Sequence, residues 1–417
     1  MPHLCLICYS FTIMGKIEFI ANGTVTSPQG FSAGAVSADI RHKGDSRLDL
    51  AVLCSQEICT VAGLFTENKI KSPSVVLCMK RAQQGKAKAI VASSGCANAS
   101  TGEQGFADAL EMSMLAAKVI DAKPDEVLIA NTGVIGVNLP MPAIRTGMKK
   151  IIVKSEGGHD FERAIMTTDT VPKEVAVTYK DGLNTFTIGG VAKGSGMIHP
   201  NLATMLVFLT TDADVTPAYL KKSLQEAAAV SFNMISVDGD TSPSDTMLFM
   251  ANGLAKNETV TGKSALAVVF QQALNQVCIY LAKAIARDGE GATKLIEVNV
   301  KGAANLKEAR LAARTVVSSN LLKAAIYGND PNWGRVTAAL GRSGAQVEES
   351  KLDVYMGKIL VLKQGTPVPF DKAKAVTALK QKEVPITVLL NLGKAEATAW
   401  GCDLTEQYVV INSEYTT

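Results

Sequence analysis

Short apolar runs alternate with longer stretches of helical periodicity along the whole chain, and this alternation constrains the fold more than any other feature. The runs end at Gly, Asn or Asp and predict strands, which are expected at 51–53, 74–77, 89–93, 126–130, 205–209, 295–300, 385–392 and 407–411. Helical spacing predicts helices at 105–120, 217–231 and 263–285, the second with Thr216 as cap and Pro217 at its first position. The sequence therefore predicts a mixed α/β (α+β) fold and leaves its topology open.

No low-complexity linker divides the 417 residues, and the best internal boundary is the segment 189–200, with the sequence GGVAKGSGMIHP. Glycine lacks a Cβ, so a run rich in glycine reaches backbone conformations that other residues avoid. Regular patterns resume only after this segment. The length itself leaves room for two or three domains of about 150 residues each.

The charge balance indicates which kind of molecule the protein binds, and the cysteine content indicates the cellular compartment in which it is found. Lys and Arg total 42 against 39 Asp and Glu, a net charge of +3 that is spread evenly. Nucleic-acid binding needs a concentrated basic face, so we expect small molecules rather than nucleic acid as partners. Eight cysteines in a chain of this length are typical of a reducing compartment, which predicts a cytoplasmic protein.

Residues 1–13 form an apolar leader that predicts neither a membrane anchor nor a secretory signal. The leader is too short to span a bilayer, and no basic residue precedes its apolar run. A start at Met14 would make residues 1–13 a non-native or disordered extension. No other stretch reaches transmembrane length, so no membrane partner is expected.

The sequence motifs of metal and nucleotide sites are incomplete. Cys5 and Cys8 have zinc-like spacing without a second pair, and the acidic segment 238–245 lacks the Gly and Glu of a calcium loop. We interpret that segment as a polar turn, with a substrate-facing loop as the alternative. A P-loop requires glycine where Asn257 stands, and the dinucleotide fingerprint requires glycine where His199 stands. We therefore expect no metal and no cofactor.

Acyl-transfer chemistry needs a nucleophile and a base, and the four histidines of the chain lie in no triad-like motif. The glycine-rich segment leads instead into Ala203–Thr204 and an apolar run. Cleavage of this bond would free the α-amine of Thr204 beside its own hydroxyl. An α-amine with a pKa of roughly 7.7–8.0 is a suitable general base near neutral pH. Taken alone, the same pattern is also that of an ordinary strand start.

Eight short stretches occur along the chain in a familiar order. They are NTGVIG at 131–136, MTTDT at 166–170, KGSGM at 193–197, NLATML at 201–206, VDGDT at 237–241, GEGATK at 289–294, DPNWGR at 330–335 and NSEYTT at 412–417. Any one of them is a weak signal, but the set is specific. Through them the chain resembles the ornithine acetyltransferase (ArgJ) family from about Ile17 to Thr417.

The resemblance implies a self-processing, ArgJ/DmpA-like fold with β-sheets stacked between helical layers. It implies self-cleavage between Ala203 and Thr204 into an α chain, 1–203, and a β chain, 204–417, assembled as α2β2. By the match Thr204 is the nucleophile, and Thr132 and Gly133 form the oxyanion hole. One departure lies close to this bond: His199 stands where a small residue is expected, so we expect it to slow self-cleavage.

The implied activity transfers an acetyl group from N2-acetyl-L-ornithine to L-glutamate in arginine biosynthesis, and acetyl-CoA is a candidate second donor. Carboxylate and ammonium groups of such substrates suit charged and hydroxyl side chains. The substrate contacts implied by the resemblance are Thr167 or Thr168, Lys193, Thr204, Glu290, Asn412 and Thr417.

Two alternatives to this function stay open from the residues. The same scaffold could act on another acyl substrate, as an N-terminal-nucleophile aminopeptidase or an acetyltransferase of an antibiotic pathway. A non-enzymatic α/β protein that binds small amino acids is the third reading. It ranks last because a binder has no need for the combined glycine-rich and threonine-bearing motifs.

Overall fold

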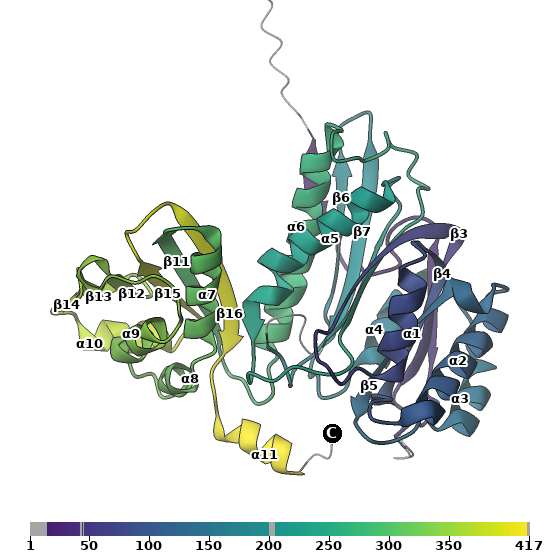
Figure 1. The fold of residues 1–417 in the computed structure, drawn as a ribbon, viewed down its shortest axis with the longest axis horizontal. Coiled ribbons are helices and arrows are strands. Elements are labelled where there is room, and N and C mark those ends of the chain that lie inside the picture. Colours follow the sequence, from purple (N-terminus) through teal and green to yellow (C-terminus); the bar gives the residue numbers. More distant parts are fainter. Residues whose placement is uncertain (1–14, 42–43, 45, 200–204, 415–417) are drawn as a thin grey trace, which may run out of the picture.

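The computed structural model describes residues 15–41, 44, 46–199 and 205–414, and Figure 1 shows two lobes that differ in size. The predicted cleavage pair Ala203–Thr204, the terminal Thr417 and the leader 1–13 lie outside the described residues. Seven of the predicted site residues, from Thr132 to Asn412, lie within them.

The larger lobe is built on a nine-stranded sheet within the described residues. Eight strands follow the order β1-β6-β7-β8-β10-β3-β4-β5, and β2 pairs with β3 beside this path. Most neighbours are antiparallel, whereas β8–β10 and β4–β5 are parallel. The strands are β1 (Lys16–Phe19), β2 (Phe31–Val36), β3 (Leu50–Phe65), β4 (Lys86–Cys96), β5 (Val127–Val134), β6 (Glu174–Lys180), β7 (Thr185–Lys193), β8 (Leu206–Thr211) and β10 (Thr246–Ala251).

The smaller lobe holds a seven-stranded sheet in the order β14-β13-β12-β15-β11-β16-β9, counted over the residues that the structure describes. β11 is central and pairs in parallel with β15 and antiparallel with β16. The strands are β9 (Ile235–Ser236), β11 (Leu295–Ala303), β12 (Asp353–Met356), β13 (Ile359–Lys363), β14 (Thr366–Pro367), β15 (Glu383–Leu389) and β16 (Ala395–Cys402).

Helices cover both sheets. In the larger lobe α1 and α2 pack against β4 and β5, α4 against β2–β4, and α5 and α6 against β3, β6 and β7, while α7 covers β11 and β16 in the smaller lobe. The 22-residue α6 also contacts β16 and β9, so it joins the two lobes. The helices are α1 (Pro73–Ala82), α2 (Gly102–Val119), α3 (Met141–Met148), α4 (Gly158–Ile165), α5 (Pro217–Val230), α6 (Leu266–Arg287), α7 (Leu306–Val317), α8 (Asn320–Tyr327), α9 (Trp333–Gly341), α10 (Lys372–Leu379) and α11 (Glu406–Glu414).

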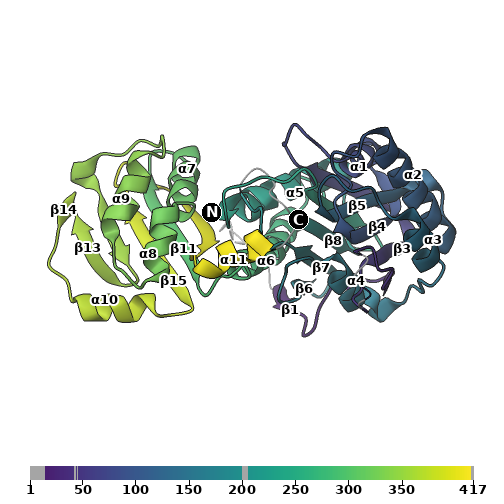
Figure 2. The ribbon, with the colours of Figure 1, turned by 90° about the horizontal axis from the view of Figure 1, so that it is seen from below.

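The mixed α/β class is confirmed, as are most of the predicted elements. Periodicity located α2, α5 and α6, and the apolar runs located β3, β4, β5, β8, β11 and β15. Pro217 opens α5 as predicted, although the Thr216 side chain donates to the Val260 carbonyl instead of capping the helix. Figure 2, which views the molecule from below, shows the C-terminal α11 in front of the junction of the two lobes.

Two predicted strands are helices. Residues 74–77 belong to α1, because Pro73 suits the first helical position and the Ser72 hydroxyl accepts the Val75 N–H as a cap. Residues 407–411 belong to α11, although their run of β-branched residues favours a strand. For residues 74–77 this N-terminal cap outweighs the local preference for a strand.

The predicted boundary at 189–200 is also wrong for its first half. Residues 189–193 lie inside β7, paired with β6 on one side and with β8 on the other. β7 precedes and β8 follows the predicted cleavage pair, so strands from both predicted chains share one sheet. Cutting the chain between them would leave these backbone hydrogen bonds in place.

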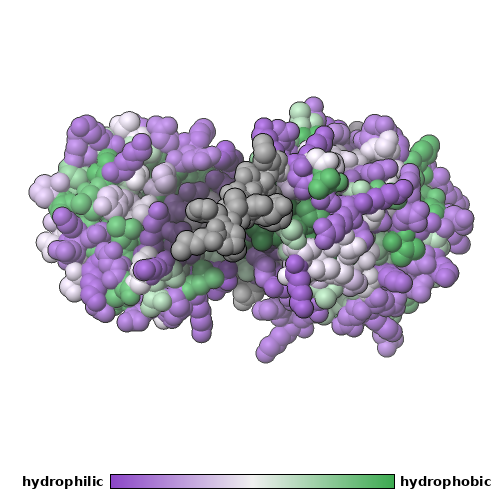
Figure 3. All heavy atoms as spheres, turned by 90° about the horizontal axis from the view of Figure 1, so that it is seen from above, coloured by the Kyte–Doolittle hydropathy of each residue, from purple (hydrophilic) through white to green (hydrophobic). Residues whose placement is uncertain are grey.

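No helix among the described residues is long and apolar enough to cross a membrane. Figure 3 shows a largely hydrophilic face over both lobes, with apolar residues scattered among the polar ones. All six cysteines that the structure describes are buried free thiols.

Candidate active site

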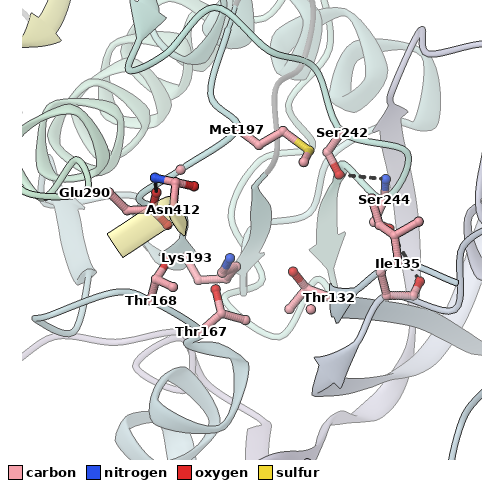
Figure 4. A pocket seen from close by; sticks show the side chains of 13 residues that line it. Thr132, Ile135, Thr167, Thr168, Lys193, Met197, Ser242, Ser244, Glu290 and Asn412 are labelled. Atoms are coloured by element: carbon pink, nitrogen blue, oxygen red, sulfur yellow. Dashed lines mark hydrogen bonds between the residues drawn. The ribbon is translucent and has the colours of Figure 1, made fainter. Parts of the chain in front are cut away.

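A pocket opens where the two lobes meet, and segments far apart in the sequence line it. All seven predicted site residues that the structure describes take part in this lining (Figure 4). They are Thr132, Gly133, Thr167, Thr168, Lys193, Glu290 and Asn412. The sequence prediction therefore brought together residues that the fold does place in one cavity.

Thr132 and Gly133 lie at the end of β5, which runs parallel to β4. Gly133 has φ +130°, and a Cβ there would lie 2.3 Å from the Gly95 carbonyl carbon on the neighbouring strand. Only glycine fits this position, where β5 stays paired with β4 up to Val134 at the pocket wall. The Thr132 side chain points into the pocket in Figure 4.

A buried polar network supports this end of β5 from behind. Asn131 is 1% exposed, and its amide donates to the Ser93 hydroxyl at 2.6 Å while its oxygen accepts from Ser74. Successive strand residues face opposite sides, so anchoring Asn131 inward directs Thr132 toward the pocket. Asn131 thus has a structural role at the pocket wall.

Thr167 and Thr168 follow α4 and face the end of β7, where Lys193 lies. The Thr168 hydroxyl is 2.6 Å from the Ser195 hydroxyl, which holds the two segments together. The Lys193 side chain is only 4% exposed. Burial lowers the pKa of Lys193, and Asp169, whose carboxylate is 3.9 Å away, opposes that shift.

Glu290 supplies the carboxylate of the pocket from the turn after α6. Its backbone N–H donates to the Ser195 carbonyl at 2.8 Å, and its side chain accepts from the Asn412 amide at 2.8 Å. A Cβ at Gly196 would lie 2.5 Å from this carboxyl group, so glycine is needed for the close approach. Lys193 and Glu290 thus present opposite charges to one cavity, an arrangement suited to an amino acid.

Further lining residues were not singled out by the sequence prediction. They are Ala97, Ile135, Gly196, Met197, Ser242 and Ser244. Two of them, Ser242 and Ser244, belong to the acidic segment 238–245 interpreted as a polar turn. The segment connects β9 to β10 and two of its residues line the pocket, so its position fits both the polar turn and the alternative of a substrate-facing loop.

The acidic residues of that segment hold backbone groups near the site. Asp238 accepts the N–H groups of Met197 and Ile198, and Met197 adopts a left-handed conformation with φ +56°. Asp245 accepts the Met205 N–H at 3.1 Å. These aspartates are organisers of the site's backbone, and a group of three or more His, Cys, Asp and Glu side chains that could hold a metal is absent from the described residues.

His199 packs away from the cavity lining. Its Nδ1 lies 3.1 Å from the Ser236 hydroxyl on β9, and burial lowers its pKa, helped by Arg314. The His199 ring is therefore held against the smaller sheet by its contact with Ser236, and the lowered pKa favours its neutral form.

Comparisons with known proteins match the sequence of this chain over nearly its whole length. The model of the ArgJ family matches residues 32–417. The arginine biosynthesis bifunctional protein ArgJ of Symbiobacterium thermophilum is 53% identical over 403 residues, 96% of this chain and all of the relative, and that of Dehalococcoides mccartyi is 50% identical over 402 residues, 96% and 99%. The crystal structure of the protein of the same name from Bacillus halodurans is 47% identical, with a TM-score of 0.49, and the match covers 50% of this chain and 98% of that chain. The chain belongs to the ArgJ family.

Proposed function

We propose that this protein transfers an acetyl group from N2-acetyl-L-ornithine to L-glutamate. As a member of the ArgJ family it is an acetyltransferase of arginine biosynthesis, and its relatives over the full length carry that pathway in their names. The observation that supports this substrate class best is the pocket itself, where Lys193 and Glu290 face one cavity beside three threonines. An amino acid carries the two charges that complement this pair.

In the proposed mechanism Thr204, freed by cleavage after Ala203, attacks the acetyl carbonyl while its own α-amine accepts the hydroxyl proton. The negative charge that develops on the carbonyl oxygen is stabilised by Thr132 and by the Gly133 N–H. Ornithine then leaves with a proton from the amine, and the amine of glutamate attacks the acetyl ester to complete a ping-pong cycle. In this scheme the pocket binds the charged groups of each substrate that do not react, so that the reacting nitrogen is placed at the acetyl group.

Lys193 is the proposed partner of the substrate carboxylate, and Glu290 that of its ammonium group. Asn412 orients Glu290 through their 2.8 Å hydrogen bond, and Thr167 or Thr168 adds a hydroxyl contact. Thr417 is proposed as a further contact on the family resemblance alone, and Asn412 of the preceding α11 lines the pocket.

Several finer features belong to the proposal. Acetyl-CoA is a candidate second donor, because the relatives are named as bifunctional. We propose an α2β2 assembly and a cytoplasmic location, the latter because the buried free thiols suit a reducing compartment. The aminopeptidase and antibiotic-pathway alternatives are not favoured by the named relatives.

The test is an assay of the purified protein with acetylornithine and glutamate, quantifying ornithine and N-acetylglutamate together. Equal amounts of the two products are expected, with none from Thr204→Ala. A parallel assay should offer peptide amides as substrates. Peptide hydrolysis without transfer to glutamate would contradict the proposed activity, and turnover with acetyl-CoA and glutamate alone would establish the second donor.

A further inference from the structure

A buried cluster of alternating charges lies directly behind the pocket and none of its three inner members lines it. Lys173 donates to Asp169 at 2.7 Å and to Asp288 at 2.6 Å, and the side chains of Lys173 and Asp169 are fully buried. Lys193 completes the row at 3.9 Å from Asp169. Removing charges from water costs several kcal/mol per ion, so a cluster of this kind calls for a specific reason.

The cluster ties together three segments that line the pocket. Asp169 accepts the N–H of Thr167 at 2.9 Å and that of Gly194 at 2.7 Å, so one carboxylate fixes both the threonine pair and the turn after Lys193. Asp288 accepts the Thr170 N–H at 3.0 Å and directly precedes Gly289-Glu290. The same buried carboxylates, Asp169 and Asp288, therefore position the segments that carry Lys193, Glu290 and the threonine hydroxyls of the pocket.

We propose that Asp169 is a positioning residue that keeps Lys193 charged and in place as the receptor of the substrate carboxylate, with Lys173 and Asp288 neutralising the remainder of the cluster. This inference rests on the proposed function for the role of Lys193. Its core, the dependence of the Lys193 charge on Asp169, concerns the free protein and needs no turnover.

The charge balance explains why Asp169 is needed. Burial lowers the pKa of Lys193, Lys173 lowers it further, and Asp169 acts in the opposite direction. Asp288 also pairs with Lys173 and balances its charge. The second carboxylate oxygen of Asp169 is therefore left to face Lys193. The Lys193 ammonium group makes no hydrogen bond to another described residue, so its donors remain for a ligand.

Four charged groups face Lys193 from the elements around it. Asp169 and Lys173 come from the segment before β6, Glu290 from the turn after α6, and Asp245 from the segment before β10. Burial raises the pKa of Asp245 well above its usual value, which limits its use as a countercharge. Glu290 raises the pKa of Lys193 less than Asp169 does and forms no ion pair with it. Asp169 is thus the closest permanent countercharge of Lys193 within the described residues.

The test compares Asp169→Asn with wild type by the pH dependence of Lys193 acetylation under trace acetic anhydride, read by peptide mass spectrometry. The amide keeps the size of the side chain and removes its charge. We expect the labelling midpoint of Lys193 to fall by about one pH unit or more, because a buried ammonium group loses its nearby anion. The KM for acetylornithine and that for glutamate, which both carry a carboxylate, should rise about 30-fold at pH 8. Both values should recover toward wild type as the pH falls to 6 and Lys193 regains its proton.

Two further variants separate this role from a structural one. Lys173→Gln removes the neighbouring cation, so the Lys193 midpoint should move upward, opposite to Asp169→Asn, and this arm stands if Asp169→Asn does not fold. Asp212→Asn is the matched control, since Asp212 is a buried carboxyl that accepts the N–H groups of Gln29 and Thr187 away from the pocket. It should cost stability and leave the Lys193 midpoint unchanged.

Wild-type labelling midpoints in both Asp169→Asn and Lys173→Gln would overturn the inference, whatever the kinetics show. A shift of the same sign in both would also overturn it, because general loosening of the fold would then explain the data. Failure of wild type to transfer acetyl would instead refute the proposed function, and the labelling experiment would still decide the charge of Lys193.

Discussion

The two sheets of this molecule differ in how their strands are buried and in whether buried charges lie beside them. Strand β7 of the larger sheet is buried along most of its length and ends at Lys193, which lines the pocket in front of buried Asp169 and Lys173. Strand β15 of the smaller sheet alternates, with Val384, Ile386 and Val388 buried and the residues between them turned outward. The first pattern places charged groups out of water beside a cavity, whereas the second is a plain two-faced sheet.

The difference teaches where function is concentrated. Buried charges are unfavourable for folding unless paired, so a protein that needs only stability has no reason to collect them on one side. The larger lobe accepts this cost around the pocket, and the smaller lobe contributes Glu290 and Asn412 from its edge. Substitutions in the two regions should therefore affect different quantities.

The largest effect is expected at the pocket wall. Thr132→Val keeps the shape of the side chain and removes the hydroxyl proposed for the oxyanion, so kcat should fall by about 10²–10³-fold with KM nearly unchanged. The matched change in the smaller sheet is Thr398→Val, which removes a hydroxyl bonded to Asn299 at 2.8 Å. It should leave kcat within about 2-fold of wild type, since surface-side changes away from the site act weakly. Equal losses in the two variants would break the comparison.

The next effect concerns the pH dependence of stability. Burial raises the pKa of Glu162 on α4 from 4.5 to about 8, and one of its carboxyl oxygens has no hydrogen-bond partner. Between these two pH values the folded protein retains a proton that the unfolded chain releases, so Glu162 makes stability fall as the pH rises.

Glu162→Gln removes this titration and can still accept the Lys173 N–H. Relative to wild type the variant should gain stability progressively from pH 5 to pH 8, by a few kcal/mol at most, since each pKa unit corresponds to about 1.4 kcal/mol. Urea unfolding at three pH values measures this gain. Asp160→Asn, which removes a partly exposed carboxylate from the same helix, should show no such trend. A Glu162→Gln difference that is constant with pH would refute the prediction.

The smallest effect is expected in the core of the smaller sheet. Ile386 is fully buried and pairs with Val298 and Met356 across the sheet. Ile386→Val should lower the free energy of unfolding by about 0.5–1.5 kcal/mol and leave acetyl transfer per folded molecule unchanged. Ile129→Val on β5 should cost similar stability and also reduce kcat, because that strand carries Thr132. Unchanged kcat in Ile129→Val would show that the pocket wall tolerates repacking.

The sequence predicted the regular elements well where one signal dominated. Helices α2 and α6 have long apolar periodicity, and β11 has a clear run of β-branched residues. Residues 74–77 and 407–411 failed because a valine-rich run has the same appearance in a strand and in a short helix. In the first case the deciding cap, Ser72 with Pro73, lies just outside the run.

The sequence predicted which residues belong to the site, but it did not predict how they are arranged in space. The motif order identified Thr132, Lys193 and Glu290, whose roles no periodicity reveals. The cluster behind them was out of reach, because Lys173 and Asp288 are 115 residues apart and each alone has the appearance of a surface charge in the sequence. Only the packing of the segment before β6 against the end of α6 brings them together.

The central claim is that Thr204 becomes an N-terminal nucleophile, and the most direct measurement is intact mass spectrometry of purified wild type beside Thr204→Ala. We predict two chains for wild type, of 203 and 214 residues, the second beginning at Thr204. Thr204→Ala should remain one chain of 44.0 kDa without acetyl transfer. An uncut wild-type chain that transfers acetyl at full rate would contradict the account.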